Sequence, residues 1–415
     1  MSKVTNLLKR IGGYLFSKEK VFPYLRIYRV LGFTFVVDIR NRVKKGAIQK
    51  NKVVFWSTTN TYACNPKYIA NALLEQGESL DIVWVVDTSS VELADFPEGV
   101  RVVSNSKDAV YEISTAGVFV ANERTMRWLS RGLEKQYGQI YINTWHGALG
   151  IKKTGVDRED FKPIDYKRCD YDSALYDILL SNGTYSTKLY SRIFFNHGKA
   201  FETGLPRNDI FFKKSYLKFK KTFDINPETK VVLYAPTWRE RGNRSIDAFD
   251  AGPVTKALER RFGGRWQLVY RLHHLQKKSV NMNGIDVSGY PDIQEIMAEV
   301  DAVITDYSSC IYDFVLTKKP GFIYATDSID YNNSRGLYYP LEETPFPVAE
   351  TQSELVKNIL NFDNDLYYEK VRLFLLQKGA REDGLASRRV ASFIINYLKK
   401  DILDFGLLDQ ANRIF

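Results

Sequence analysis

The stretch Ala302-Val303-Ile304-Thr305-Asp306-Tyr307-Ser308-Ser309 joins a strand-like apolar run to a helix-like run that begins at Ile311. Its last two residues carry adjacent hydroxyl groups at the start of the predicted helix. Free backbone N–H groups and the helix dipole at such a turn favour a phosphate group. The same two serines would also suit an ordinary helix N-cap. From this stretch alone, both interpretations stay open.

Strand-like and helix-like segments alternate along the chain in two series. The first series extends from Val53–Trp56 to Ile140–Thr144, and the second from Val231–Tyr234 to Gly321–Ala325. Short apolar runs that alternate with helices indicate a parallel sheet with helices on both faces. The sequence therefore predicts an α/β fold of two Rossmann-like, doubly wound domains that face a cleft. Ligands of such folds bind at the carboxyl ends of the strands.

A chain of 415 residues is too long for one ordinary domain. The pattern predicts a basic amphipathic segment over 1–48, an N-terminal Rossmann-like domain over 49–205, a C-terminal one over 206–385 and a helical segment over 386–415. We expect the join between the two domains around Gly204–Asp209.

The positive charge is concentrated at the N-terminus. Residues 1–50 contain twelve Lys and Arg against two acidic residues, a net charge of +10 that equals that of the whole chain. Nucleic acid and an anionic membrane are the natural partners of such a segment. Apolar residues recur within it at helical spacing, at Val4, Leu7, Leu8, Ile11 and Leu15. Basic residues beside such a face favour an interfacial membrane anchor over nucleic acid, with a solvated helix packed on its own domain as the alternative.

Several other chemistries are not indicated. The three cysteines lie far apart, so a reducing compartment without disulfides is expected. Neither a P-loop nor a G-x-G-x-x-G after the first strand is present, which argues against a dinucleotide site. The triplet Asp170-Tyr171-Asp172 has the form of a metal-binding DxD, but a solvated turn in a loop is the favoured interpretation. No metal site or other cofactor is predicted, and a need for Mg²⁺ stays open.

Histidines at strand ends are the candidate catalytic residues. His146 follows one predicted strand, and His273 and His274 follow another. The imidazole side chain ordinarily titrates near neutral pH and suits a general base, although a structural histidine is the commoner case. Four arginines near the expected cleft could neutralise a diphosphate, although each alone is more often an ion-paired or surface residue: Arg207, Arg239, Arg271 and Arg335.

Six ordered blocks of the sequence together resemble the CDP-glycerol glycerophosphotransferase family, the teichoic-acid primases and polymerases of bacterial envelopes. The blocks are Thr144-Trp145-His146-Gly147, Thr203-Gly204-Leu205-Pro206-Arg207-Asn208-Asp209, Leu233-Tyr234-Ala235-Pro236-Thr237-Trp238-Arg239, Arg271-Leu272-His273-His274-Leu275, Ile304-Thr305-Asp306-Tyr307-Ser308-Ser309, and Asp330-Tyr331 through Arg335-Gly336. One block alone would be a weak signal, whereas this many in one order is specific.

The resemblance implies a GT-B-like fold with an N-terminal acceptor domain and a C-terminal CDP-alditol donor domain. It implies a transferase that moves an alditol phosphate, glycerol phosphate first and ribitol phosphate next, from a CDP-alditol and releases CMP. The implied acceptor is a hydroxyl of a lipid-linked polyol phosphate or glycan in teichoic acid or capsule-type polymer synthesis. Members of the family act peripherally at the cytoplasmic face of the cell membrane, which agrees with the basic segment.

The resemblance also implies roles for residues. The family's catalytic histidine corresponds to His146, and its second histidine, associated with the donor phosphates, corresponds to His273. The paired hydroxyls correspond to Ser308 and Ser309. The other expected substrate contacts are Arg207, Arg239, Arg271, His274, Asp306 and Arg335. After Trp-His-Gly the family often has Thr-Pro-Leu-Lys, whereas this chain has Ala148-Leu149-Gly150-Ile151-Lys152-Lys153, so neither lysine receives a role.

Two other functions fit some of the same features. A GT-B glycosyltransferase that uses a nucleotide sugar would share the fold and the diphosphate site. A non-catalytic, membrane-bound scaffold or nucleic-acid binder would rely on the basic segment instead. The products separate these alternatives, because alditol-phosphate transfer yields a phosphodiester and CMP, whereas glycosyl transfer yields a glycoside and a nucleoside diphosphate.

Overall fold

The structure is a computed structural model that describes strands 25–30 and 33–38 and then ten ranges: 46–86, 96–129, 131–147, 149–158, 161–194, 199–213, 218–239, 249–272, 282–400 and 403–408. The predicted helical stripe from Val4 to Leu15 lies outside the described residues, as do His197, His273 and His274.

The N-terminal half forms a seven-stranded sheet in which all neighbouring strands are parallel. In spatial order its strands are β5 (Val100–Val103), β4 (Asp81–Val85), β3 (Gln49–Trp56), β6 (Ala116–Ala121), β7 (Ile140–Asn143), β8 (Ile178–Ser181) and β9 (Lys199–Glu202). The direction of winding reverses between β3 and β6. Central strands such as β6 are buried along their whole length, because helices cover both faces of the sheet.

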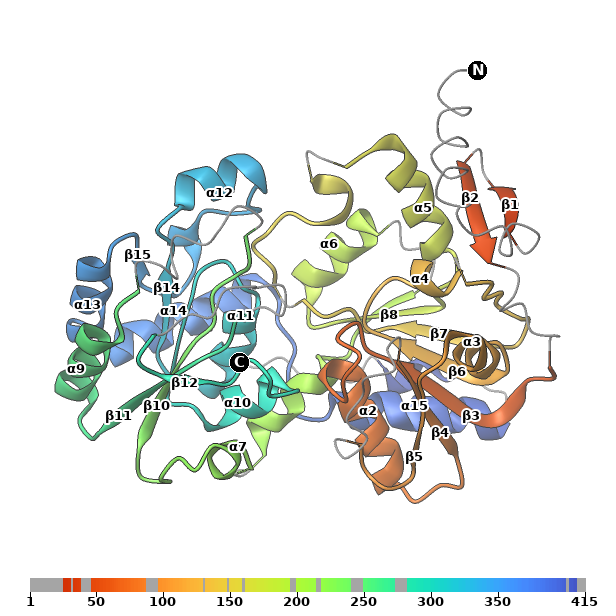
Figure 1. Cartoon of the computed structure of the whole chain (residues 1–415), viewed down its shortest axis with the longest axis horizontal. Coiled ribbons are helices and arrows are strands. Elements are labelled where there is room, and N and C mark those ends of the chain that lie inside the picture. The colour runs from red at the N-terminus through yellow and green to blue at the C-terminus, as the bar shows by residue number, and fades with distance from the viewer. Residues whose placement is uncertain are drawn as a thin grey trace, which may run out of the picture.

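The C-terminal half forms a six-stranded parallel sheet beside the first one (Figure 1). Its spatial order is β12 (Ile285–Asp286), β11 (Trp266–Tyr270), β10 (Lys230–Tyr234), β13 (Ala302–Thr305), β14 (Gly321–Tyr324) and β15 (Val348–Ala349). Here the winding reverses between β10 and β13, as in a doubly wound Rossmann-like unit. The predicted α/β fold with two such units is therefore confirmed, whereas the exact domain limits stay a prediction.

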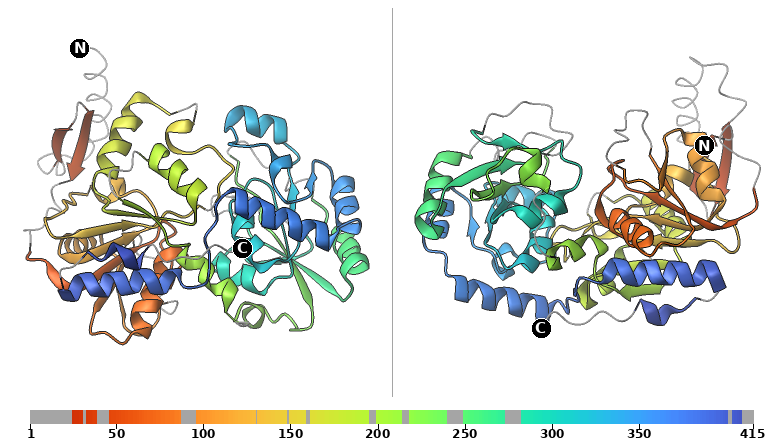
Figure 2. Two further views of the ribbon diagram at one scale, coloured as in Figure 1. Left: turned by 180° about the vertical axis from the view of Figure 1, so that it is seen from behind. Right: turned by 90° about the horizontal axis from the view of Figure 1, so that it is seen from below.

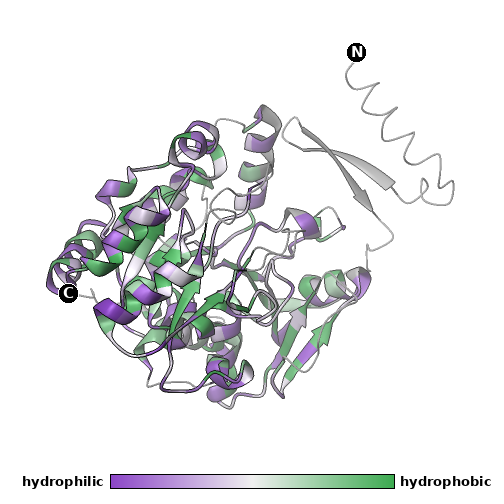
Figure 3. Cartoon of the chain, turned by 60° about the vertical axis from the view of Figure 1, so that its left-hand side comes forward, coloured by the Kyte–Doolittle hydropathy of each residue, from purple (hydrophilic) through white to green (hydrophobic). Residues whose placement is uncertain are grey.

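Helices connect successive strands in both halves. Those of the first half are α2 (Cys64–Glu75), α3 (Ser106–Ser114), α4 (Met126–Leu129), α5 (Pro163–Ser173) and α6 (Thr184–Ile193). Those of the second half are α7 (Lys218–Thr222), α9 (Ala251–Phe262), α10 (Ile293–Glu299), α11 (Cys310–Phe314), α12 (Ser328–Ser334) and α13 (Gln352–Leu360). Apolar residues gather in the strands at the centre of each half, and polar residues predominate on the outer helices (Figure 3). None of the helices within the described ranges is long and apolar enough to cross a bilayer.

Two long helices near the C-terminus tie the halves together. Helix α14 (Asn364–Gln377) contributes Phe374 to the core of the second half, whereas α15 (Ala386–Lys400) packs on α2 and contributes Phe393 to the core of the first. The two helices follow one another along one side of both domains (Figure 2). Helix α15 ends at Lys400 and a separate 3-10 turn at Phe405–Leu407 follows, whereas residues 409–415 of the predicted helical segment lie outside the described residues. Asp404 caps that turn by accepting a hydrogen bond from the backbone N–H of Gly406 at 3.1 Å.

The basic N-terminal segment contains a hairpin that the sequence analysis did not assign. Strand β1 (Leu25–Val30) pairs antiparallel with β2 (Phe33–Asp38), so that Val30 faces Phe33. Both strands are rich in aromatic and β-branched residues, which suit a pleated strand. The hairpin lies beside α5, at the outer end of the first half (Figure 1).

Candidate active site

The two reversal points of the sheets bring together polar segments that lie far apart in the sequence. In the first half, the backbone N–H of Thr58 after β3 donates to Asn122 Oδ1 after β6, at 2.9 Å. In the second half, the N–H of Thr237 after β10 donates to Asp306 Oδ1 after β13, at 2.8 Å. Ligands of open α/β sheets bind where the winding reverses, at the carboxyl ends of the strands. The topology therefore marks these two turns as the place to look for a site.

His146 lies next to the reversal point of the first sheet, shortly after β7. Its Nδ1 lies 2.7 Å from the backbone carbonyl oxygen of Asn122, and Glu123 Oε2 lies 3.7 Å from the same nitrogen. A carbonyl oxygen can only accept a hydrogen bond, so Nδ1 carries a proton, and in the neutral imidazole the lone pair is on Nε2. The side chain of His146 is 37% exposed, so a substrate can reach the ring. This arrangement is what a general base requires.

The backbone around His146 is strained and held from several sides. Trp145 has a φ of 50°, which is unfavourable for a residue with a bulky side chain, and its N–H donates to Asn143 Oδ1 at 2.8 Å. The Trp145 ring lies against the imidazole, with 4.2 Å between the ring centroids. Four further side chains donate to backbone carbonyls of residues 144–149: Asn65, Arg207, Tyr190 and Tyr339. Such over-determined strain is typical of functional sites.

Arg207 is placed differently from what the sequence suggested. It lies in the 3-10 helix Pro206–Phe212 between the two sheets and is 3% exposed, so it is a buried, ion-paired arginine. Its Nη1 donates to the backbone carbonyl of His146 at 2.5 Å, and its Nη2 pairs with Asp313 at 2.8 Å. Arg207 therefore positions the histidine and links the two halves.

The turn after β13 contains the carboxylate of Asp306, which is paired with Arg239, and the hydroxyl groups of Ser308 and Ser309. Asp306 is 2% exposed, whereas Ser308 and Ser309 are half-buried. Ser309 begins α11 without any side-chain capping bond, whereas Ser308 Oγ accepts a long bond of 3.5 Å from the N–H of Cys310 and also interacts with the Cys310 thiol. The N-cap interpretation of the two serines is therefore weak in the described part of the chain, and their hydroxyls remain able to bind a ligand.

Arg239 is held in an ion cluster with two carboxylates. Its Nη2 donates to Asp306 at 2.9 Å, and its Nε donates to Asp327 at 2.9 Å. Its guanidinium also lies over the rings of Tyr307 and Tyr331, which stack on each other with 3.8 Å between their centroids. The two carboxylates raise the pKa of Arg239 despite its partial burial. Arg239 and Asp306 thus shape the turn that presents the serines.

The other two arginines lie at the edges of the same region. Arg271, at the end of β11, is half-buried, and its Nη1 donates to the carbonyl oxygens of Val287, at 3.3 Å, and of Tyr290. Burial lowers the pKa of Arg271. Arg335, after α12, donates from Nε to the backbone carbonyl of Lys153 at 3.1 Å. Lys153 belongs to the segment that enters the second half from the first. His273 and His274 follow Arg271 directly but lie outside the described residues.

The acidic triplet 170–172 is corrected, because it lies in the last turns of helix α5 and not in a solvated loop. Asp172 is 1% exposed and accepts hydrogen bonds from Thr125 and from the hydroxyl of Tyr176. Burial raises the pKa of Asp172 to about 6. Within the described ranges, no group of three or more His, Cys, Asp or Glu residues is placed to hold a metal ion.

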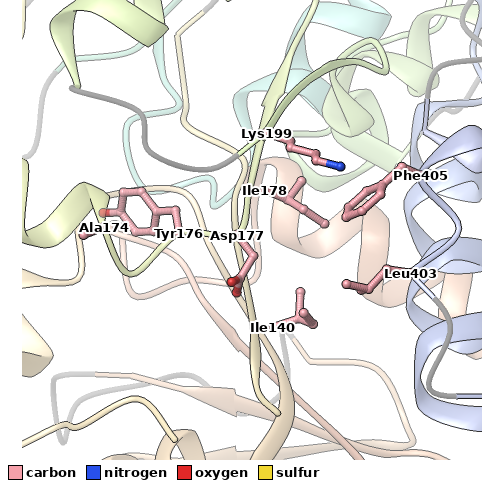
Figure 4. A pocket seen from close by; sticks show the side chains of 8 residues that line it. All are labelled: Ile140, Ala174, Tyr176, Asp177, Ile178, Lys199, Leu403 and Phe405. Atoms are coloured by element: carbon pink, nitrogen blue, oxygen red, sulfur yellow. The ribbon is translucent and has the colours of Figure 1, made fainter. Parts of the chain in front are cut away.

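A cavity of about 290 Å³ lies away from this region (Figure 4). It is bounded by the amino-terminal ends of β7, β8 and β9 and by the segment after α15, with Ile140, Asp177, Lys199 and Phe405 among its lining residues. Because ligands of these sheets bind at the opposite, carboxyl ends of the strands, this cavity is not the candidate site.

Sequence reasoning missed the residues that support the site from a distance. The backbone carbonyl of Asn122 binds the histidine ring, and the buried amide of Asn65 donates to the backbone carbonyls of Thr144 and Trp145; neither residue stands in a quoted block. The only available signal for Asn122 was its place directly after a predicted strand. Tyr190 and Tyr339 come from distant helices and loops, so no local pattern could have identified them.

The comparisons with known proteins bear directly on this site. Residues 38–396 match the family described as CDP-Glycerol:Poly(glycerophosphate) glycerophosphotransferase. A teichoic acid poly(glycerol phosphate) polymerase of Bacillus spizizenii is 29% identical over 84% of this chain and 94% of its own length. A teichoic acid glycerol-phosphate transferase of Staphylococcus aureus is 30% identical over 83% of this chain and 93% of its own length.

A solved structure agrees with the sequence matches. The wall teichoic acid polymerase TagF is similar with a TM-score of 0.73 and 26% identity, over 88% of this chain and 92% of that chain. This likeness supports the GT-B-like arrangement of the two parallel sheets. The chain thus belongs to the CDP-glycerol:poly(glycerophosphate) glycerophosphotransferase family, and it is a transferase that moves an alditol phosphate from a CDP-alditol.

Proposed function

We propose that this enzyme transfers glycerol phosphate from CDP-glycerol to a hydroxyl group of a lipid-linked acceptor, in teichoic acid or capsule-type polymer synthesis, and releases CMP. Glycerol is favoured over ribitol because the two relatives described above, which match 84% and 83% of this chain, are both named for glycerol phosphate. The acceptor is a polyol phosphate or a glycan carried on a lipid.

The observation that carries the mechanism is the hydrogen bond from His146 Nδ1 to the carbonyl of Asn122. It leaves Nε2 to take the proton of the acceptor hydroxyl. The acceptor oxygen then forms a bond to the phosphorus that bears the alditol, and the bond from that phosphorus to the CMP oxygen breaks. A positioned base of this kind typically supplies about 10²–10⁴-fold in rate, and positioning and electrostatics supply much of the rest.

The donor diphosphate is proposed to bind at the turn after β13. Ser308 and Ser309 offer hydroxyl groups there, while Asp306 and Arg239 hold the turn through their ion pair. His273 is proposed as the second catalytic residue, which stabilises charge on the donor phosphates. Further positive charge and hydrogen bonds are assigned to His274, Arg271 and Arg335. No metal ion is included in this scheme.

The basic N-terminal segment is proposed to hold the enzyme at the cytoplasmic face of the membrane, where a lipid-linked acceptor is presented. Its net charge of +10 within residues 1–50 favours an anionic lipid surface. The strands of its hairpin add aromatic and aliphatic residues, which partition into the interface. The cysteines Cys64, Cys169 and Cys310 are free, which suits a reducing compartment.

The test is CMP release by the full chain with CDP-glycerol, CDP-ribitol or UDP-glucose, each with and without a lipid-linked glycerol-phosphate acceptor in anionic vesicles. We expect CMP release from CDP-glycerol that depends on the acceptor. Release of CMP from CDP-ribitol alone would identify CDP-ribitol as the donor and leave the proposed reaction class unchanged. Release of UDP from UDP-glucose, without CMP from either alditol donor, would contradict the proposal.

Membrane association has its own measurement, co-sedimentation of the full chain with vesicles. We expect binding to vesicles that contain anionic lipid, lost at high salt, and little binding to neutral vesicles. Equal binding to both kinds of vesicle would contradict the proposal that the positive charge of the segment attracts it to anionic lipid.

A further inference from the structure

The segment after His146 leaves the first half of the molecule and enters the second. Leu149 and Ile151 are each 1% exposed, and both belong to the hydrophobic core of the second half. The N–H of Lys153 donates to the carbonyl of Gly336 at 3.0 Å, and the N–H of Tyr338 donates to the carbonyl of Ile151 at 2.7 Å. These bonds form a short antiparallel bridge in which Lys152 faces Leu337. The position of Lys152 is therefore fixed by the second half, although the first half precedes it in the chain.

The ammonium group of Lys152 lies at the turn proposed for the donor diphosphate. Asp306 and Cys310 on that turn raise the pKa of Lys152, while Arg335 and Arg239 lower it, so the ammonium group lies within electrostatic range of these four side chains. Burial is the largest effect and leaves the pKa of Lys152 below its usual value. Asp306 is the only carboxylate in this group, and it is already paired with Arg239 at 2.9 Å. Arg239 is paired with Asp327 as well, so both of these carboxylates are engaged by Arg239 and neither forms an ion pair with Lys152 in the described part of the chain.

Lys152 itself has no ion pair in the described part of the chain, although it is half-buried. A half-buried ammonium group without a counter-ion is costly, because it has given up part of its hydration. A phosphate group at this turn would supply the missing negative charge.

The neighbouring Lys153 is placed differently. Successive side chains on an extended segment point to opposite sides, so Lys152 and Lys153 face different surroundings. Gly336 has a φ of 77°, and a Cβ atom added to it would lie 2.7 Å from Lys153 Cδ. The side chain of Lys153 therefore lies against the backbone at Gly336, whereas Lys152 interacts electrostatically with Asp306 and Cys310.

We infer that Lys152 binds the phosphate group of the donor that is transferred, the one bearing the alditol. This inference rests on the proposed function and extends it. The same segment carries the base His146 and, six residues later, this cation, so both meet the phosphorus that the acceptor attacks. A cation beside the transferred group neutralises charge on its oxygens in the transition state, which is the main catalytic demand of phosphoryl transfer.

The test is calorimetric binding of CDP and of CMP to the full-length wild type, Lys152→Met and Lys153→Met, with CMP release from CDP-glycerol measured in parallel. CDP carries a phosphate at the position of the transferred group, whereas CMP does not. We expect Lys152→Met to weaken CDP binding about tenfold or more, to leave CMP binding within about twofold, and to lower kcat/KM for CDP-glycerol. Lys153→Met should leave both affinities within about twofold of the wild type.

Retained CMP affinity also shows that the variant is folded, and Lys152→Gln carries the same expectation if Lys152→Met does not fold. Unchanged CDP binding in a folded Lys152 variant would overturn the inference. Equal losses of CDP and CMP binding would also overturn it, because Lys152 would then act on the phosphate that leaves with CMP. A wild type that binds neither nucleotide would contradict the proposed function instead.

Discussion

Arg207 donates a hydrogen bond from Nη1 to the backbone carbonyl of His146 at 2.5 Å, while its Nη2 pairs with Asp313 at 2.8 Å. His146 belongs to the first half of the molecule and Asp313 to helix α11 in the second. Asp313 is 1% exposed, and burial raises its pKa even with this partner. One buried guanidinium therefore ties the position of the candidate base to the position of the donor-binding half.

Replacing Arg207 by lysine should impair catalysis more than donor binding. A lysine keeps the positive charge near Asp313 but cannot make both bonds with the fixed geometry of a guanidinium. We expect Arg207→Lys to lower kcat at least about tenfold while CDP affinity stays within about twofold. Arg389→Lys is the matched control, because Arg389 is a buried arginine paired with Asp383 away from His146. Equal losses of kcat in the two variants would show that Arg207 has only a structural role.

Ser309 should matter for the donor and not for the stability of α11. Its side chain makes no capping bond, so Ser309→Ala should change the free energy of unfolding by less than about 0.5 kcal/mol. CDP affinity should fall severalfold, since one hydroxyl donor to the phosphates is lost.

Thr351→Ala is the control for this prediction, because Thr351 Oγ1 accepts from the N–H of Glu354 at 3.2 Å in a capping box of α13. That variant should lose about 1 kcal/mol of stability and keep its CDP affinity. Urea unfolding and calorimetry measure both quantities. A Ser309→Ala variant that is destabilised like Thr351→Ala, with normal CDP affinity, would restore the N-cap interpretation.

Lys67 should couple the two halves. From α2 it pairs with Asp292 at 2.7 Å and with Glu295 at 2.6 Å on α10, and Asp292 is 1% exposed. Removing one partner of such a buried pair typically costs about 3–5 kcal/mol, because a charge is left buried without compensation. We expect Lys67→Met to lower both Tm and kcat/KM, since the halves would no longer be held in one orientation.

Lys52→Met is the comparison for Lys67, because Lys52 forms a buried pair with Glu112 at 2.7 Å inside the first half only. It should lower Tm without lowering kcat/KM when both are assayed well below their melting temperatures. If the two variants lose activity to the same extent, the pair at Lys67 does not couple the halves.

Asp172 should make the protein less stable as the pH rises. Burial raises its pKa to about 6, above its value of about 3.9 in an unfolded chain, so the folded state binds the proton more tightly. Its contribution to stability is complete below the unfolded pKa and is lost as the pH rises through about 6. Asp172→Asn cannot ionise, so between about pH 5 and about pH 7.5 its free energy of unfolding should improve by about 1 kcal/mol relative to the wild type. Parallel stability curves for the two proteins would contradict this assignment.

The sequence predicted the parallel sheets because their strands are short buried apolar runs. Val231–Tyr234 and Ala302–Thr305 were identified from local pattern, and the turns that follow them contain Arg239 and the serines. Local pattern could not show that α15 returns to the first half, because an amphipathic helix can pack equally well on either core.

Some functional relationships depend on contacts between distant parts of the chain. The sequence placed Arg207 near the cleft as a substrate contact, with an ion-paired or surface arginine as the alternative, but it could not name Asp313 as the partner, because that pair forms only when the two halves meet. Lys152 received no role because the spacing after Trp-His-Gly departs from the family pattern, and its bridge to Leu337 joins segments far apart in the sequence. The charged triplet 170–172 was assigned to a solvated loop from its local sequence. That sequence could not show that the distant Thr125 binds Asp172 in a buried position.

The most direct test of the central claim compares CMP release by the wild type and by His146→Ala, with CDP-glycerol and a lipid-linked acceptor, alongside CDP binding to both. If His146 is the general base, the variant should release CMP about 10²–10⁴-fold more slowly while its CDP affinity stays within about twofold. A variant that binds CDP normally and keeps near wild-type turnover would show that another group removes the acceptor proton.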